Sequence, residues 1–104
     1  MNQKMHESLR LDLNNPVFRR RIFDLSKGEQ HDILNRLRKL AEMTWQQVYV
    51  DHGLKWEAIL SQKGPGDEKL YSFRIDKGFR CLAYRDGLWL RLLSLYVDHD
   101  SVYR

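Results

Sequence analysis

The sequence predicts an α+β fold in which a short strand and a helical hairpin pack on a mainly antiparallel sheet that ends in a C-terminal β-meander. From about residue 16 to residue 43, apolar residues recur at the spacing of amphipathic helices, whereas after Gly53 they alternate or form short runs, as in strands. Two dipeptides with glycine, Lys77-Gly78 and Asp86-Gly87, then separate three β-rich segments. The chain has 104 residues, of which 42% are hydrophobic, and this suits one domain over positions 1–104.

The composition excludes several classes of protein. Cys81 is the sole cysteine, so an internal disulfide is impossible and a cysteine-based zinc site is not expected. No apolar run approaches the roughly 20 residues that a membrane helix needs, and the polar segment 1–10 does not resemble a signal peptide. We therefore expect a cytoplasmic protein that does not enter a membrane.

The first segments carry a strand signal and a helix start. Apolar and polar residues alternate over 9–13, which predicts a short, half-buried strand. Asn14-Asn15-Pro16 follows, and an asparagine cap with proline at the first helical position favours a helix start. We expect this helix to reach about residue 25, with Phe18 on its apolar face and Arg19-Arg20-Arg21 solvated.

Two capping boxes predict two further helices. Residues 26–29 (Ser-Lys-Gly-Glu) begin the longer helix, which we expect to end near Met43. Residues 44–47 (Thr-Trp-Gln-Gln) begin a short helix that should end near His52, with Gly53 as its stop. An apolar stripe predicts the buried face of the longer helix, and its members are Ile33, Leu34, Leu37, Leu40 and Ala41.

The C-terminal half predicts four strands, over residues 54–60, 70–76, 79–85 and 88–97. Asp86-Gly87 predicts a type I′ hairpin turn. The last strand is nearly all apolar, which predicts a central strand covered on both faces. The residues expected in the core of this half are Phe73, Ile75, Phe79 and Cys81, and the tryptophans at positions 45, 56 and 89 are expected there too.

Positive charge is concentrated between residues 69 and 91. This window holds six basic and two acidic residues, so it alone accounts for the chain's net charge of +4. A basic stripe on strands is suited to binding phosphates, and the alternative is a solvated sheet face. The basic residues are Lys69, Arg74, Lys77, Arg80, Arg85 and Arg91.

Several short motifs follow one another in the last third of the chain. An aromatic-x-arginine-apolar element contains Arg74, and after a short turn comes the aromatic–arginine pair Phe79-Arg80 with an apolar run that ends in Tyr84. His99 and the valine–tyrosine pair Val102-Tyr103 lie near the C-terminus. In this order the motifs resemble those of the RelE/ParE toxin superfamily, whose helical hairpin packed on a sheet also fits the predicted elements.

The resemblance implies the toxin of a type II toxin–antitoxin system that cleaves mRNA on the ribosome without a metal or other cofactor. Its partners would be a cognate antitoxin protein, mRNA and the ribosome. Such cleavage needs a base, an acid and cations that stabilise the extra negative charge of the transition state. The resemblance implies catalytic roles for Arg74, Arg80, His99 and Tyr103. Through their charge alone, RNA contacts are expected of Lys63, Lys69, Lys77 and Arg85.

Other interpretations of these residues stay open at this stage. The arginines can be solvated and His99 can be a loop histidine, although Asp98 and Asp100 favour its protonated form and so a role as an acid. Glu57 is a possible base that nothing in its spacing singles out. Two alternative functions share the fold: a ParE-like inhibitor of DNA gyrase, which is no enzyme, and an inactive superfamily member that binds RNA.

Overall fold

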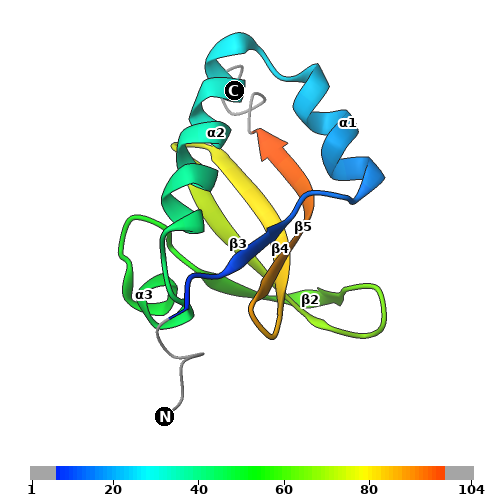
Figure 1. Ribbon diagram of the computed structural model, residues 1–104. Coiled ribbons are helices and arrows are strands. Elements are labelled where there is room, and N and C mark those ends of the chain that lie inside the picture. The colour runs from blue at the N-terminus through cyan, green and yellow to red at the C-terminus, as the bar shows by residue number, and fades with distance from the viewer. Residues whose placement is uncertain (1–6, 98–104) are drawn as a thin grey trace.

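The computed structural model describes residues 7–97, and the expectations for His99 and Tyr103 lie outside them. Within residues 7–97, three helices and five strands follow one another in the predicted order (Figure 1). No helix among the described residues is long and apolar enough to cross a membrane. The elements are β1 (Arg10–Asp12), α1 (Pro16–Asp24), α2 (Lys27–Ala41), α3 (Trp45–Val50), β2 (Glu57–Lys63), β3 (Lys69–Asp76), β4 (Phe79–Asp86) and β5 (Trp89–Val97).

Local sequence signals set the starts of all three helices. The Asn15 side chain accepts hydrogen bonds from the first turn of α1, which has proline at its start. Ser26 and Glu29 form the predicted capping box of α2, with the Glu29 amide donating to Ser26 at 3.2 Å and the Ser26 amide donating to Glu29 at 2.9 Å. Thr44 forms the same box at the start of α3. Each cap satisfies amide groups that the helix itself leaves unpaired.

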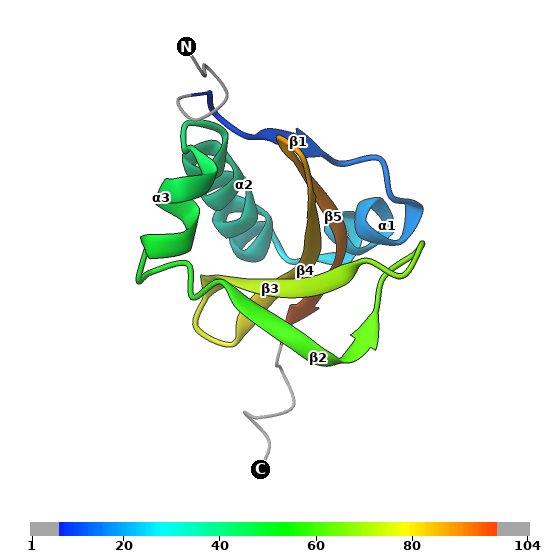
Figure 2. The ribbon, with the colours of Figure 1, turned by 90° about the horizontal axis from the view of Figure 1, so that it is seen from below.

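The strands form one mixed sheet in the order β1-β5-β4-β3-β2. The antiparallel pairs β2–β3, β3–β4 and β4–β5 confirm the meander, and β1 pairs in parallel with β5. α2 packs over β3 and β1, while α1 runs beside β5. β2 lies on the side of β3 away from α2 (Figure 2).

The core lies between α2 and the sheet. Ile33, Leu37 and Leu40 are buried in one cluster with Phe73 and Cys81, which confirms most of the predicted stripe. Two members were predicted wrongly: Leu34 is 63% exposed and Ala41 is also exposed. Each of these follows a buried residue directly and therefore points about 100° away from it around the helix.

The predicted boundary between α3 and β2 was wrong by several residues. The helix ends at Val50, and the strand starts at Glu57 rather than at Leu54. Leu54 is buried and its amide donates to the Asp51 carboxylate at 2.9 Å, so this segment is a packed turn. The helix therefore ends before the predicted stop at Gly53, and the residue of this segment with a left-handed backbone is Lys55, with φ of 48°.

The hairpin between β4 and β5 was also predicted wrongly in its type. Asp86 pairs with Trp89, so Gly87 and Leu88 are the two central residues of the turn. Gly87 has a φ of 62°, and Leu88 is not among the described residues with positive φ. A type I′ turn needs positive φ at both positions, whereas glycine at the first position alone fits type II′.

A β-bulge in β5 decides which of its side chains face the core. Leu82 pairs with Ser94 and Ala83 pairs with Leu92, so Leu93 is an extra residue without a partner in the ladder. The bulge puts Leu95 in the core and Tyr96 on the opposite face, where it is 48% exposed. The expectation that the last strand is covered on both faces was therefore wrong, as was the expectation that Trp89, 37% exposed, lies in the core.

Candidate functional site

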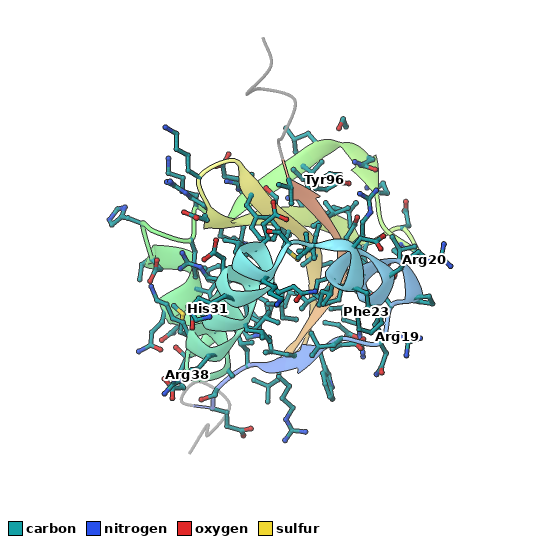
Figure 3. The ribbon with its side chains drawn as sticks, turned by 90° about the horizontal axis from the view of Figure 1, so that it is seen from above. Arg19, Arg20, Phe23, His31, Arg38 and Tyr96 are labelled. Atoms are coloured by element: carbon teal, nitrogen blue, oxygen red, sulfur yellow. The ribbon has the colours of Figure 1, made fainter. Side chains whose placement is uncertain are left out.

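Two arginines and a tyrosine form a row across three strands. Arg74 on β3 pairs directly with Arg80 on β4, and Arg80 pairs directly with Tyr96 on β5. Residues that pair directly share one face of a sheet. Because their neighbours Phe73 and Cys81 are in the core, the row lies on the outer face, which is the face of β3–β5 that points away from α2. Figure 3 shows Tyr96 at the end of β5.

The guanidinium of Arg80 is held in place by neutral oxygen atoms. Its Nε donates to the Ser72 hydroxyl at 3.1 Å, and its Nη2 donates to the same hydroxyl at 2.8 Å and to the Lys55 carbonyl at 2.9 Å. Its Nη1 makes no hydrogen bond within residues 7–97. The side chain is 30% exposed. This cation is therefore oriented and still has donors to offer, which suits an anionic ligand.

Glu57 brings a carboxylate to the same place. Its side chain is 63% exposed, and its Oε1 lies 3.6 Å from Arg80 Nη2. Glu57 starts β2 and pairs with Ser72, the hydroxyl acceptor of Arg80. An exposed, longer-range pair of this kind contributes little to stability, so the carboxylate is available for other chemistry. From the sequence, Glu57 was one possible base among others. Its place beside Arg80 follows from where β2 starts, which the sequence did not predict.

Cations gather around Arg80. Arg74 and Lys77 line a hollow of about 270 Å³ together with Lys55, Asp76, Gly78 and Arg80. Arg74 lies directly opposite Arg80, an arrangement of like charges that destabilises a sheet. No ion pair of Arg74 occurs among the described residues. The uncompensated charge indicates a place for an anion.

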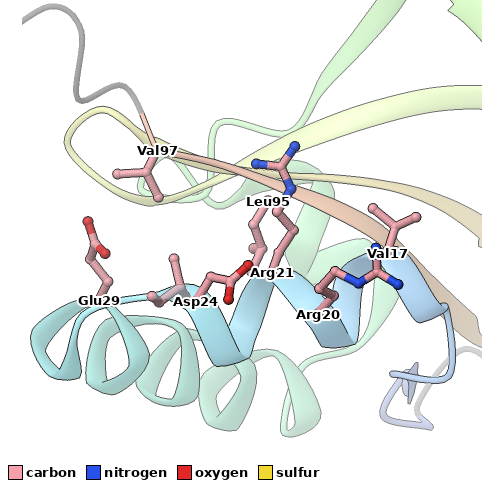
Figure 4. A pocket seen from close by; sticks show the side chains of 8 residues that line it. Val17, Arg20, Arg21, Asp24, Glu29, Leu95 and Val97 are labelled. Atoms are coloured by element: carbon pink, nitrogen blue, oxygen red, sulfur yellow. The ribbon is translucent and has the colours of Figure 1, made fainter.

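A second, larger hollow adjoins the first, since Gly78 and Arg80 line both. Its volume is about 560 Å³. Leu82, 8% exposed, contributes an apolar surface, while Tyr96 and Gln62 contribute polar groups. Arg21 also lines it and extends from α1 toward β5, as Figure 4 shows for the neighbouring pocket at α1. We call the two hollows together the Arg80 groove.

The four residues that were predicted to contact RNA lie in three different places. Lys77 is in the groove. Lys63 and Lys69 are exposed and pair with each other at the opposite end of β3 from Arg74. Arg85 lies on the other side of the sheet from Arg80, where it covers the rings of Trp45 and Tyr49 and donates to the Tyr49 hydroxyl at 2.7 Å. Of the four predicted contacts, the structure brings only Lys77 to Arg80.

Cys81 and Tyr84 also belong to the motif on β4, and the structure places Cys81 in the core and leaves Tyr84 half-buried. Cys81 is fully buried, and burial raises the pKa of its thiol well above the usual value, as expected of a core residue. Tyr84 is half-buried, and burial together with the nearby Glu68 carboxylate raises the pKa of its phenol. Over residues 7–97, no group of three His, Cys, Asp or Glu side chains could hold a metal ion.

The sequence predicted Arg74 and Arg80 but missed Tyr96, Ser72 and Arg21. Tyr96 was missed because strict alternation from the buried Leu90 and Leu92 would point it into the core, and only the bulge reverses this. Arg21 lies in an arginine run that was predicted to be solvated, and it was missed because its place depends on where α1 packs.

Comparison with known proteins supports the fold. A chain of the archaeal RelE–RelB complex from Pyrococcus horikoshii OT3 is similar in structure, with a TM-score of 0.60 and 18% sequence identity. The similarity covers 88% of this chain and 97% of that one. No family model matches the sequence, and no curated protein matches it. The RelE-like fold is therefore shown by structure and not by sequence.

Proposed function

We propose that this chain is the toxin of a type II toxin–antitoxin system and that it cleaves mRNA on the ribosome. The observation that carries the proposal is the oriented guanidinium of Arg80, with Arg74 and Tyr96 beside it in the row and the Glu57 carboxylate 3.6 Å away. Cations, a carboxylate and a phenol on one open face are the groups that phosphodiester cleavage needs. The RelE-like fold supports the same function.

In the proposed reaction a base takes the proton of a ribose 2′-hydroxyl, the O2′–P bond forms, the P–O5′ bond breaks, and an acid protonates the leaving 5′-oxygen. The products are a 2′,3′-cyclic phosphate and a 5′-hydroxyl. Glu57 is the proposed base. Arg80, through its Nη1 group, and Arg74 bind the phosphate oxygens and stabilise the charge that develops on them. Tyr96 and His99 are the two candidates for the acid, Tyr96 from its place in the row and His99 from the sequence, and the role of Tyr103 stays a prediction from the sequence.

One observation favours a second candidate, a ParE-like inhibitor of gyrase. Both Nε and Nη2 of Arg80 are already engaged within the protein, by Ser72 and by the Lys55 carbonyl. An arginine of this kind can serve mainly to connect the turn before β2 with β3 and β4. In that case the row would be a binding surface without catalysis, and Glu57 would be dispensable.

The proposed partners are a cognate antitoxin, mRNA and the ribosome, and the proposed location is the cytoplasm. The structurally similar archaeal chain comes from a complex of RelE with RelB. For this chain we propose an antitoxin with an acidic segment that covers the Arg80 groove, because the cations of Arg74 and Lys77 line the groove and attract carboxylates.

Induced expression without an antitoxin tests the proposal. Growth should stop, and primer extension should find new 5′ ends within coding sequences of cellular mRNA. Arg80→Ala should remove these ends, because loss of one stabilising cation slows cleavage by about a hundredfold or more. Arg38→Ala is the matched control, since Arg38 is an exposed arginine on α2 (Figure 3) and should leave cleavage unchanged. Growth arrest without new mRNA ends would contradict the nuclease and favour the gyrase inhibitor.

A further inference from the structure

We propose that a third hollow, between α3 and the start of β2, binds an unpaired nucleobase of the RNA strand whose phosphate lies at Arg80. This inference rests on the proposed function and extends it to a neighbouring nucleotide. The hollow has a volume of about 690 Å³, and its lining includes Tyr49, His52, Lys55 and Trp56. We call it the α3 hollow. Its size is in the range of small-molecule sites.

The two aromatic rings of the α3 hollow are partly open and rigidly held. Tyr49 is 50% exposed, and its hydroxyl accepts a hydrogen bond from Arg85 at 2.7 Å. Trp56 is half-buried and stacks on Tyr71, with ring centroids 4.8 Å apart and planes 14° apart. Trp45 meets Trp56 edge-on at 5.4 Å. Rings that are fixed before binding lose little entropy when a base stacks on them.

The charges at the rim favour an anionic ligand with an aromatic part. Of the two carboxylates of the lining, Asp51 is paired with Lys39 at 3.1 Å, and Glu57 lies 3.6 Å from Arg80. Lys55 makes no ion pair among the described residues. A free ammonium group beside partly exposed rings matches a nucleotide, whose phosphate binds the cation while its base stacks.

Lys55 connects the α3 hollow to the Arg80 groove. It lines the α3 hollow and also the smaller of the two hollows of the Arg80 groove. Its carbonyl accepts a hydrogen bond from Arg80 Nη2 at 2.9 Å. The residue holds a left-handed backbone with φ of 48°. This conformation is unfavourable for residues other than glycine, and it is enriched at functional sites. One strand of RNA can therefore place a phosphate at Arg80 and a flanking base at Trp56.

Binding of short RNA strands to the full chain tests the inference. The probes are a fluorescently labelled 2′-O-methyl uridine strand, which resists cleavage, and an abasic strand with the same number of phosphates. Wild-type protein should bind the uridine strand about tenfold more tightly than the abasic strand, because stacking adds to the phosphate contacts. Tyr49→Ala should remove most of this preference, whereas Tyr49→Phe, which keeps the ring, should retain it.

Two controls separate stacking from misfolding and from charge. Phe23→Ala removes a ring that is 79% exposed on α1, and it should leave the preference for uridine intact. Lys55→Ala should weaken binding of both strands and lower the slope of log K against log salt by about 0.7. Tryptophan fluorescence can report base stacking directly. Trp89→Phe removes the exposed tryptophan outside the hollow, and Trp45 is only 4% exposed. Quenching on binding of the uridine strand to this variant should therefore report Trp56.

The outcomes distinguish this inference from the proposed function. Equal binding of the uridine and abasic strands, or an unchanged preference in Tyr49→Ala, would overturn the α3 hollow as a base site. A protein that bound neither strand would overturn it as well. The mRNA ends mapped in cells would decide the nuclease independently of these results. A hollow that bound only an antitoxin peptide, and no RNA, would contradict the nucleobase and assign the surface to a protein partner.

Discussion

Ser72 accepts two hydrogen bonds from Arg80, one from Nε at 3.1 Å and one from Nη2 at 2.8 Å. Among residues 7–97, Ser72 is the only buried polar residue, at 7% exposure. A polar group is rarely buried unless it is hydrogen-bonded, and here its partner is the guanidinium of the candidate site. The hydroxyl therefore acts as a positioning group that fixes the direction of the Arg80 side chain.

Ser72→Ala is expected to lower the rate of mRNA cleavage by about tenfold while the protein stays folded. The guanidinium keeps its charge but loses the acceptor that aligns it, and misalignment of a stabilising cation is costly to the transition state. Ser72→Thr keeps the hydroxyl and should restore most of the rate. Single-turnover cleavage in a reconstituted translation system measures this. Equal rates for wild type, alanine and threonine variants would show that the hydroxyl does not position Arg80 for catalysis.

Glu57→Gln tests the proposed base. A general base contributes about 10²- to 10⁴-fold to a rate, so the amide variant should cleave at least a hundredfold more slowly. Melting should change little, because the carboxylate is 63% exposed and lies 3.6 Å from its cationic partner. Glu68→Gln, at the other end of the β2–β3 hairpin, is the matched carboxylate control for cleavage. Full activity of Glu57→Gln would assign the base to another residue.

Leu37→Ala tests the packing of α2 on the sheet. Leu37 is 6% exposed in the main cluster, so its truncation should lower the free energy of unfolding by about 2–5 kcal/mol through lost burial and a cavity. Leu34→Ala removes the same atoms from a side chain that is 63% exposed, and it should change stability by no more than about 0.5 kcal/mol. Urea denaturation compares the two, and similar losses would contradict the placement of the helix face.

The parts of the fold that the sequence predicted well are those set by neighbours in the chain. The caps at Asn15, Ser26 and Thr44 depend on contacts within a few residues, and all three are present. The turn at Gly78 has the positive φ that glycine favours, 71°. The meander followed from these turns and from the alternation between them.

The parts that the sequence could not predict depend on contacts between distant residues. Lys55 takes up a left-handed backbone two residues after Gly53, although glycine adopts that conformation at lower cost. Its carbonyl is paired with Arg80, 25 residues away, which no local rule anticipates. Tyr96 joins the row only because of the bulge at Leu93, and a bulge leaves no clear mark in a run of apolar residues. The sequence therefore predicted part of the candidate site, namely Arg74, Arg80 and Lys77 with Glu57 as a possible base, and it missed the residues whose place depends on distant contacts.

The Asp12–Arg91 pair predicts how stability depends on pH. Arg91 Nη1 donates to the Asp12 carboxylate at 2.7 Å and so connects β1 to β5. This hydrogen bond is the main cause that lowers the pKa of Asp12 in the folded protein, and the Asn14 amide adds to it. A carboxyl whose pKa is lowered by folding stabilises the protein above its unfolded pKa, near 3.9, and loses that contribution as the pH falls through the folded value.

Asp12→Asn should therefore lower the free energy of unfolding by about 1–2 kcal/mol at pH 7, since it removes a charge-assisted hydrogen bond from a carboxylate whose side chain is only 17% exposed. The difference from wild type should shrink as the pH falls from 5 toward 3, because the wild-type carboxylate then becomes protonated as well. Urea denaturation at a series of pH values measures both curves. Asp24→Asn, at an exposed carboxylate on α1 that has no hydrogen bond or ion pair among residues 7–97, should follow the wild-type curve throughout. A difference for Asp12→Asn that stayed constant down to pH 3 would show that the loss comes from packing and not from the ion pair.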